Sequence, residues 1–451
     1  MNPGIFREYD IRGVAGKDIQ EEDVVNIGKA YGSLLKKDNK KIVSVGRDCR
    51  QTSEQYARLL IEGIISTGCD VIDIGVCPTP VLYFSIQHLS LEGGAMVTAS
   101  HNPPEYNGFK LLSGTDSIHS GGLQDIRIII ENNEFAMGDG KVTKKDVITP
   151  YKENILNNIN IKKTIKVGID AGNGTGGITA LPVLKHLGCK VYDIYCDMDG
   201  TFPNHEADPT QKKNLFDLIK LVKENNLDLG VGYDGDGDRI GVVDKNGEVI
   251  YGDQLIVIYA REILHRDPGA TFISEVKCSM VMYDEIKKLG GNAIMWRTGH
   301  SLIKKKMKEE NAALAGEMSG HMFFKDRYLG FDDALYATCR LLEIMADTGL
   351  GVDELIKDLP KTFTTPEIRV ECRDEIKFGV VDKIVAYFKA KQDVVDIDGL
   401  RALYDDGWGL VRASNTQPAL VLRFEALTRE RLAEIRGEIE SVLKNIIEET
   451  K

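Results

Sequence analysis

Paired cysteines, long apolar runs and an excess of basic residues are all missing from this 451-residue chain. Its eight cysteines are scattered and none form a C-x-x-C pair, so we expect neither a zinc knuckle nor a dithiol centre. The N-terminus has no apolar signal core, and no apolar run could span a membrane, which predicts a reduced, cytoplasmic location without a membrane partner. The net charge of -12 argues against a nucleic-acid surface.

The composition is that of an ordinary globular protein, with 42% hydrophobic and 28% charged residues. The chain is too long for one hydrophobic core, which predicts about three or four domains. Because the overall charge is negative, any phosphorylated substrate would need a locally basic cleft.

A pattern of strands and loops recurs three times. Each repeat begins with a β-branched strand running into a polar or glycine loop, at residues 41–48, 164–174 and 270–279. A helix-like stretch follows. After it comes a second strand that begins just after a glycine, at 67–75, 187–195 and 289–297. A third strand then leads into a loop rich in reactive side chains. Helix alternating with apolar strand predicts parallel βαβ units, whose ligands usually bind at the carboxyl ends of the strands.

The last eighty or so residues read instead as a small mixed α+β unit. We therefore predict an α/β protein of three similar tandem α/β domains, with mixed, mainly parallel sheets, and a smaller C-terminal α+β domain. Polar stretches with glycine or proline mark the boundaries, which gives domains of residues 1–146, 147–250, 251–364 and 365–451.

The stretch "TASHNPPEYNGFK" places Ser100 beside His101 where a buried strand should end. Adjacent side chains on an extended backbone point to opposite faces, so this dipeptide is expected to be a poor nucleophile–base pair. A polar loop with local turn bonds explains the segment about equally well.

The sharpest local signal is "DGDGDR", in which glycines separate Asp234, Asp236 and Asp238. Three carboxylates that close would repel one another unless a cation neutralised them, and hard oxygen ligands suit Mg²⁺ or Ca²⁺. An acidic turn is the weaker interpretation. Arg239, directly after the loop, would suit a phosphate oxygen.

A second glycine-rich loop, "AGNGTGG", fits G-x-G-x-x-G through Gly172, Gly174 and Gly177. The pattern is typical of a dinucleotide site but is common by chance, and the other two repeats lack it. We favour a tight strand-to-helix turn and keep an NAD-dependent enzyme as a rival hypothesis.

Two further loops carry polar side chains that suit a sugar phosphate. In "GEMSGH", Glu317, Ser319 and His321 are two residues apart, so an extended loop would turn all three toward one ligand, such as sugar hydroxyls. The segment "RASNTQP", with Arg423 on the next strand, reads as a phosphate-binding loop or as an ordinary hairpin turn.

Several basic residues admit a structural interpretation as well as a functional one. His300 opens a helix-like stretch, and a lone histidine is more often structural than catalytic. The run from Lys304 to Lys306 is most simply a solvated helix face. Lys277 ends a strand, either as an exposed charge or as a phosphate ligand.

Together, the four loops make the whole chain resemble the α-D-phosphohexomutases, most closely the bacterial phosphomannomutase/phosphoglucomutase type. The resemblance implies a phosphoserine loop, a metal loop, a sugar loop and a phosphate loop, one per domain, around one central cleft with a mobile fourth domain. It also implies one Mg²⁺ per chain, a hexose 1,6-bisphosphate that acts as intermediate and activator, and hexose phosphates as substrates. We expect a monomer, with a dimer as the alternative.

The resemblance assigns a role to each residue of these loops. Ser100 would carry the phosphoryl group, and Lys110 or His300 would act as general acid or base on the sugar hydroxyl. The metal would be held by Ser100, Asp234, Asp236 and Asp238. The transferring group would be supported by Arg12, His101, Arg239 and Lys277. The sugar would be contacted by Glu317, Ser319 and His321. The non-reacting phosphate would be held by Arg412, Ser414, Asn415, Thr416 and Arg423, with the substrate-binding Tyr9 nearby.

Sugar specificity is less sharply implied. Glu317 and Ser319 would contact the 3- and 4-hydroxyls, which glucose and mannose share, so use of both sugars is reasonable. Glucosamine-phosphate mutases usually have another residue in place of Met318, which disfavours that activity without excluding it. A non-catalytic sugar-phosphate sensor is a further alternative.

Overall fold

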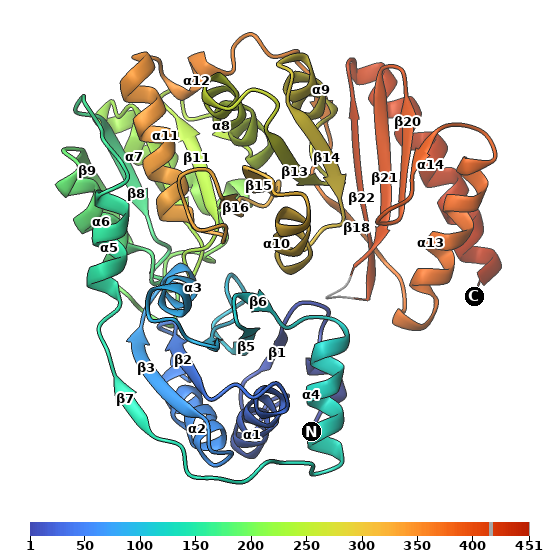
Figure 1. Ribbon diagram of the computed structural model, residues 1–451. Coiled ribbons are helices and arrows are strands. Elements are labelled where there is room, and N and C mark those ends of the chain that lie inside the picture. Colours follow the sequence, from blue (N-terminus) through green and yellow to red (C-terminus); the bar gives the residue numbers. More distant parts are fainter. Residues whose placement is uncertain (415–417, 451) are drawn as a thin grey trace.

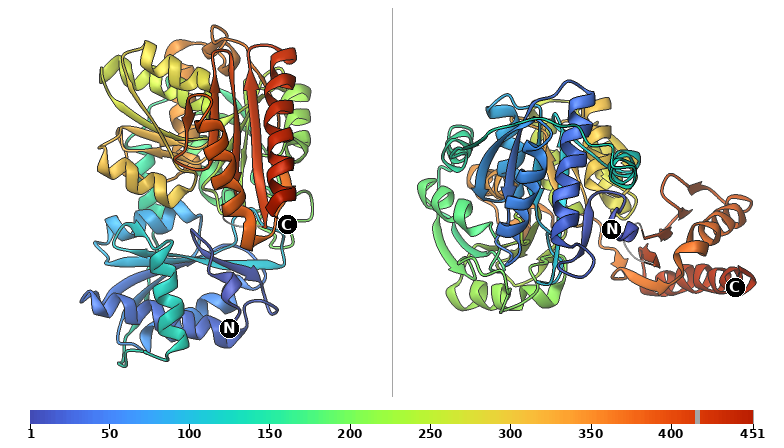
Figure 2. Two further views of the ribbon diagram at one scale, coloured as in Figure 1. Left: turned by 90° about the vertical axis from the view of Figure 1, so that its right-hand side faces the viewer. Right: turned by 90° about the horizontal axis from the view of Figure 1, so that it is seen from below.

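Four β-sheets in succession organise the chain in the computed structural model, which describes residues 1–414 and 418–450. Figure 1 shows the first sheet and its helices below, the second and third above, and the fourth at one side. The right-hand view in Figure 2 also shows the fourth unit at one side of the other three. Among the described residues, no helix has both the length and the apolar character needed to cross a bilayer.

The first sheet lies between two helical layers. Its strand order is β1 (Ile11–Val14), β5 (Tyr106–Ser113), β4 (Gly93–Val97), β2 (Ile42–Arg47), β3 (Asp70–Val76) and β7 (Val142–Lys144), with β6 (Asp116–Ser117) beside β5. One core beneath it includes residues of α1 (Glu21–Lys37), α2 (Ser53–Ile65) and α4 (Gly121–Glu131). The other core, shared with the next two units, takes in α3 (Thr79–His88). A short 3₁₀ helix, η1 (Pro3–Ile5), precedes β1.

The second and third sheets repeat this plan. The second has the order β12 (Val249–Ile250), β11 (Ile240–Asp244), β10 (Leu229–Tyr233), β8 (Lys166–Asp170) and β9 (Lys190–Ile194). Its helices are α5 (Ile148–Leu156), α6 (Gly177–His186), η2 (Lys212–Leu215) and α7 (Phe216–Asn225). The third has the order β14 (Asn292–Trp296), β13 (Thr271–Glu275), β15 (Leu314–Gly316) and β16 (Met322–Phe324). Its helices are α8 (Gly252–Arg266), α9 (Met280–Lys288), α10 (His300–Glu309), α11 (Ala334–Thr348) and α12 (Val352–Leu355).

The predicted threefold repeat is visible in the strand pairing. In each of these sheets the first strand of the repeat pairs in parallel with the second and the third: β2 with β3 and β4, β8 with β9 and β10, β13 with β14 and β15. Each third strand then pairs with an antiparallel return strand: β5, β11 and β16. The serine, aspartate and sugar loops are the connections between third and return strands, so the repeat places them at equivalent edges.

The fourth sheet is antiparallel in all its described pairings and confirms the expected change of fold. Its order is β17 (Phe363–Thr364), β22 (Ala419–Ala426), β21 (Gly407–Ala413), β20 (Leu400–Tyr404) and β19 (Val394–Val395), with β18 (Ile368–Glu371) also on β22. A single apolar cluster joins the sheet to α13 (Asp374–Lys389) and α14 (Arg429–Thr450). Because β17 pairs with β22, this sheet begins two residues before the boundary expected at 364/365.

The fourth unit is seated on the third through the segment from Val276 to Met280. Val276, Trp408 and Leu410 form a separate apolar cluster. Buried Arg401 donates to the carbonyls of Val276 and Cys278, the second at 2.9 Å, and its guanidinium lies 3.8 Å from the centre of the Trp408 ring. Burial lowers the pKa of this guanidinium. This interface between the third and fourth units therefore combines apolar packing with a buried guanidinium that is bound by backbone carbonyls.

Replacement of Arg401 by alanine should loosen this interface. The variant loses two charge-assisted hydrogen bonds, each of which contributes roughly 1.5–3 kcal/mol to stability. It also loses the packing of the guanidinium on Trp408. Limited proteolysis should then cut faster in the segment that leads into the fourth unit. Arg436→Ala provides the control, because Arg436 is exposed and its ion pair with Glu440 lies within α14. Equal cleavage rates in the two variants would contradict this role for Arg401.

Candidate active site

The loop that carries Ser100 is held in shape by buried Arg50. The Arg50 guanidinium donates to the carbonyls of Ser100 at 2.9 Å, Asn102 at 2.6 Å, Pro103 at 2.6 Å and Tyr106 at 3.1 Å. Its Nε donates to Asp48 at 3.1 Å, which keeps the buried charge paired. Sequence reasoning missed Arg50, because its partners are backbone atoms that only the folded loop brings together.

Ser100 itself contacts both its neighbour and the next unit. Its φ of 50° lies in the left-handed region, so the backbone here is not extended. The expectation that Ser100 and His101 point to opposite faces is therefore wrong, because Ser100 Oγ lies 3.1 Å from His101 Nδ1. The same hydroxyl donates to Asp234 Oδ2 at 2.7 Å. Burial, with help from Arg239 and Arg12, holds the pKa of His101 well below its usual value.

The three aspartates of the metal loop converge as expected. Asp234, Asp236 and Asp238 are each fully buried, and each offers a carboxylate oxygen within 4.8 Å of the others. Gly237, at φ 71°, makes the required tight turn. Burial and the other two carboxylates raise the pKa of Asp234 well above its usual value.

This donor set fits a hard divalent cation. All its ligand atoms are carboxylate oxygens, and Asp236 Oδ1 is buried without a hydrogen-bond partner among the described residues. Lys110, which β5 brings from the first unit, donates to Asp236 Oδ2 at 2.6 Å and to Asp238 Oδ2 at 2.5 Å. Although burial opposes it, these two carboxylates raise the pKa of Lys110 well above its usual value. The buried carboxylates therefore require positive charge close to them, and Lys110 supplies part of it.

The glycines of the loop from 172 to 177 serve close packing. A Cβ on Gly174 would lie 2.5 Å from the Gly235 carbonyl oxygen, and one on Gly177 would lie 2.5 Å from that of Cys196. Thr175 N also donates to Gly235 O at 3.0 Å. The loop therefore packs against the metal loop. This close packing explains why glycines are needed here, and no bound dinucleotide has to be invoked.

The sugar loop is a turn rather than the extended segment we expected. Glu317 O accepts from Gly320 N at 3.0 Å, and Gly320 has a φ of 90°. Glu317 and His321 therefore meet, with Oε2 and Nδ1 2.6 Å apart, while Ser319 is partly exposed between them. In this turn Ser319 can face a ligand, whereas the side chains of Glu317 and His321 contact each other.

His321 joins the sugar loop to the metal loop. Its Nε2 lies 3.2 Å from Asp238 Oδ1 and 3.3 Å from Arg239 Nε. Although burial opposes it, Asp238 raises the pKa of His321 to about 9, and His321 in turn lowers the pKa of buried Glu317 to about 2. These contacts favour the imidazolium form of His321, which lies between two carboxylates.

Tyr9, Arg12 and His300 lie around the same centre. Arg12 donates to Asn102 Oδ1 at 2.6 Å and to Asp10 at 2.5 Å, which places its guanidinium beside the Ser100 loop. Tyr9 donates to Thr298 O at 2.6 Å, and its ring centre is 6.2 Å from that of His300. Burial, with Lys304 and Lys110, holds the pKa of His300 well below its usual value.

The lysine run on α10 does not form the solvated face that we expected. Lys305 is exposed, but Lys304 is buried, with its Nζ 3.1 Å from Asp332 Oδ1. His300, Ile303, Lys304 and Met307 are the buried positions of this helix face. Their i, i+3, i+4, i+7 spacing is the signal that would have placed Lys304 inside. Asp332 carried no recognisable sequence signal.

The fourth unit contributes buried arginines at the edge of the cluster. Arg423 donates to the backbone carbonyl of Lys277. The side-chain Nζ of Lys277 lies 3.6 Å from Glu367 Oε2. Arg412 donates from Nε to Asp398 Oδ2 at 3.0 Å, and the same oxygen accepts from Thr298 N at 2.9 Å. Ser414 is buried and its carbonyl accepts from Lys377. The predicted Asn415 and Thr416 lie outside the described residues.

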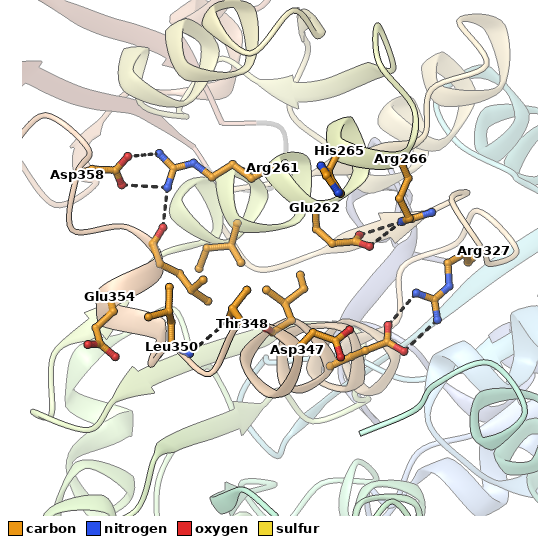
Figure 3. Close-up of a pocket in the computed structure, with 14 residues that line it drawn as sticks. Arg261, Glu262, His265, Arg266, Arg327, Asp347, Thr348, Leu350, Glu354 and Asp358 are labelled. Atoms are coloured by element: carbon orange, nitrogen blue, oxygen red, sulfur yellow. Dashed lines mark hydrogen bonds and ion pairs between the residues drawn. The ribbon is translucent and has the colours of Figure 1, made fainter. Parts of the chain in front are cut away.

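A hollow of about 720 Å³ opens elsewhere, between α8, α11 and α12. Its arginines are already paired with carboxylates: Figure 3 shows Arg261 with Asp358 and Arg266 with Glu262. Arg327 pairs with Glu343 at 2.8 Å. A phosphate would have to break these pairs, so the hollow is not a second phosphate site.

Comparison with known proteins agrees with this geometry. The models of phosphoglucomutase/phosphomannomutase alpha/beta/alpha domains I, II and III match residues 3–137, 149–247 and 251–363, and the C-terminal domain model matches 367–442. The chain belongs to the phosphoglucomutase/phosphomannomutase family. It is thus a hexose-phosphate mutase by family, and the predicted resemblance and fold class are confirmed.

Relatives match over almost the full length. The phosphomannomutase/phosphoglucomutase of Pseudomonas aeruginosa is 44% identical over 98% of this chain and 96% of its own. A phosphoglucomutase of Neisseria meningitidis is 41% identical over 98% and 97%. The crystal structure of a family protein from Burkholderia thailandensis is 41% identical, with a TM-score of 0.93, and the match covers 98% of this chain and 97% of that one.

The charge on His321 predicts a pH dependence of the metal-free fold. Because its folded pKa of about 9 exceeds the ordinary 6.5, its stabilising contribution is complete below pH 6.5 and is lost as pH rises through 9. In EDTA, the difference in unfolding free energy between the protein and His321→Gln should shrink by roughly 3 kcal/mol across this window. Urea unfolding at several pH values measures it, and a constant difference would contradict the assignment.

Proposed function

We propose that the protein reversibly transfers a phosphoryl group between the 1 and 6 positions of mannose or glucose phosphate, through phosphorylated Ser100 and a hexose 1,6-bisphosphate intermediate. One observation supports this most directly: Ser100 Oγ, from the first unit, donates to Asp234 Oδ2 of the second unit at 2.7 Å. A buried hydroxyl is thereby placed on a carboxylate cluster suited to a cation.

Mg²⁺ is the proposed cofactor, one ion per chain, and would be held by Asp234, Asp236, Asp238 and an oxygen on Ser100. When bound, it supplies positive charge that stabilises the transferring phosphoryl group. Arg12, His101 and Arg239 surround Ser100 and would bind the non-bridging phosphate oxygens, with Lys277 at the edge of the site.

In the proposed transfer, the free sugar hydroxyl attacks the phosphorus of phosphorylated Ser100. The bond from Ser100 Oγ to phosphorus breaks, and the hydroxyl proton passes to a base. His300 suits this role better than Lys110, because burial favours its neutral form, whereas Lys110 is held by two carboxylates. After the bisphosphate reorients, Ser100 Oγ attacks its other phosphorus, and the bond from that phosphorus to the sugar oxygen breaks. This sugar oxygen takes the proton back from the base, which regenerates the phosphoserine and releases the isomerised hexose monophosphate.

The remaining side chains would hold the sugar and its second phosphate. Ser319 and Glu317 would contact the 3- and 4-hydroxyls, with His321 fixing the Glu317 carboxylate at 2.6 Å. The second phosphate would be held by Tyr9, Arg412, Ser414, Asn415, Thr416 and Arg423.

The proposal also keeps the predicted domain boundaries after residues 146 and 250, a cytoplasmic location and a monomeric state, and it moves the third boundary from 364/365 to just before β17 (Phe363–Thr364). Two contacts between the fourth unit and the third support this arrangement: Asp398 accepts from Thr298 N at 2.9 Å, and Arg423 donates to the carbonyl of Lys277.

Ser100→Ala tests the phosphoserine step. Conversion of glucose 1-phosphate, with Mg²⁺ and a trace of the 1,6-bisphosphate, should fall by at least about 10³-fold, because the group that carries the phosphoryl is gone. Ser113→Ala, on the return strand of the same loop, is the control and should retain activity. A near-normal rate in Ser100→Ala would refute the mechanism.

Sugar specificity requires a direct comparison of mannose, glucose and glucosamine 1-phosphates. If the sugar loop contacts only hydroxyls that glucose and mannose share, their kcat/KM values should agree within about 10-fold, which corresponds to 1.4 kcal/mol. Activity confined to glucosamine phosphate would favour the alternative mutase. Binding without turnover of any of them would favour the sensor hypothesis.

A further inference from the structure

Two buried polar atoms face each other across α10 and the loop that precedes α11. His300 Nδ1 and Asp332 Oδ2 are 3.9 Å apart, and neither has a hydrogen-bond partner among the described residues. Their side chains are 11% and 0% exposed. A buried polar atom without a partner is costly, so two that nearly meet indicate a hydrogen bond that a small movement would complete.

Asp332 is the fixed member of this pair. Its backbone pairs with Phe323 beyond the end of the sugar loop, and the next residue, Asp333, caps α11 by accepting from Tyr336 N at 2.9 Å. Lys304 Nζ, one helical turn after His300, donates to Asp332 Oδ1 at 3.1 Å. The backbone and the lysine thus set the carboxylate plane, with Oδ2 left to face His300.

His321 is the other candidate for that oxygen, at 4.0 Å from its Nε2. Both of its ring nitrogens already contact closer carboxylates, Glu317 at 2.6 Å and Asp238 at 3.2 Å. Lys304 is not a competitor for Oδ2 either, since it binds Oδ1 and lies 4.1 Å from the centre of the Tyr83 ring. Among the described residues, His300 Nδ1 is therefore the atom near Asp332 Oδ2 that still lacks a hydrogen-bond partner.

We propose that Asp332 is a positioning residue for His300: it accepts the Nδ1 proton and so turns the Nε2 lone pair toward the sugar hydroxyl, while Lys304 fixes the carboxylate. This inference rests on the proposed role of His300 as the base. A neutral imidazole carries one N–H, and the hydrogen bond at one nitrogen decides which one carries it. Catalytic hydrogen bonds are often long in ligand-free structures and tighten when substrate binds.

The first test compares Asp332→Asn with the unchanged enzyme. The Lys304 ammonium requires the amide oxygen at the Oδ1 position, so the amide NH₂ takes the place of Oδ2 and donates to His300 Nδ1. The base would then hold its proton on the wrong nitrogen. We expect kcat to fall by at least about 10- to 100-fold with KM within about twofold, the loss that is typical when the hydrogen-bond partner of a metal-ligating histidine is removed.

Asp333→Asn is the matched control. Asp333 is equally buried and adjacent in sequence, but its carboxylate binds Tyr151, Tyr328 and the start of α11. Its loss should lower thermal stability while changing kcat much less than Asp332→Asn does. Lys304→Met should lower kcat in the same direction as Asp332→Asn, and Lys304→Arg should restore part of it.

The second test needs neither substrate nor metal. In ¹⁵N-labelled protein, the ring of His300, assigned by its loss in His300→Gln, should show a protonated Nδ1 and an unprotonated Nε2. Asp332→Asn should shift the ring toward the opposite tautomer. If wild-type activity on hexose phosphates were absent, the proposed function would fail while this tautomer result could still hold.

Two results would overturn the inference. One is a kcat in Asp332→Asn within twofold of wild type in a protein that remains folded. The other is a His300 ring that carries its proton on Nε2 in the wild-type protein, whatever the activity of the variants.

Discussion

The mutual repulsion of three buried carboxylates is the constraint on which the rest of this structure depends. Asp234, Asp236 and Asp238 have no solvent to screen them, so positive charge has to come from elsewhere in the fold. Lys110 supplies it from the first unit, and His321 supplies it from the third. The aspartate loop is therefore stabilised where the three units meet, and this meeting point is the site.

The repeated strand order explains how three units reach one point. Each reactive loop joins the third strand of its repeat to an antiparallel return strand, β5, β11 or β16. A loop of this kind lies at the same edge in each sheet, so similar units that turn these edges inward bring their loops together. The return strand also carries chemistry, since Lys110 on β5 reaches the aspartates of the second unit.

The strands, the repeat and the reactive loops were predictable, because hydrophobic alternation and glycine positions are local signals. Local rules failed where a single backbone angle decides the geometry: a left-handed Ser100 brings His101 beside the nucleophile, and a turn at Gly320 brings Glu317 to His321. Arg50 and Asp332 were beyond sequence reasoning because their partners come from distant segments. Lys304 was not beyond it, since helical spacing already placed it with Met307 on the buried face.

Two histidines from one unit show how the surroundings, rather than the residue type, set protonation. Their ring centres are only 5.5 Å apart. His321 lies between two carboxylates, which outweigh burial and favour the charged ring, whereas His300 faces Lys304 and Lys110, which add to burial and favour the neutral one. Environments that push two pKa values apart separate a proton donor from a proton acceptor. His300 is the member of this pair that can accept a proton from the attacking hydroxyl, and in the reverse direction the same ring returns that proton to the sugar oxygen.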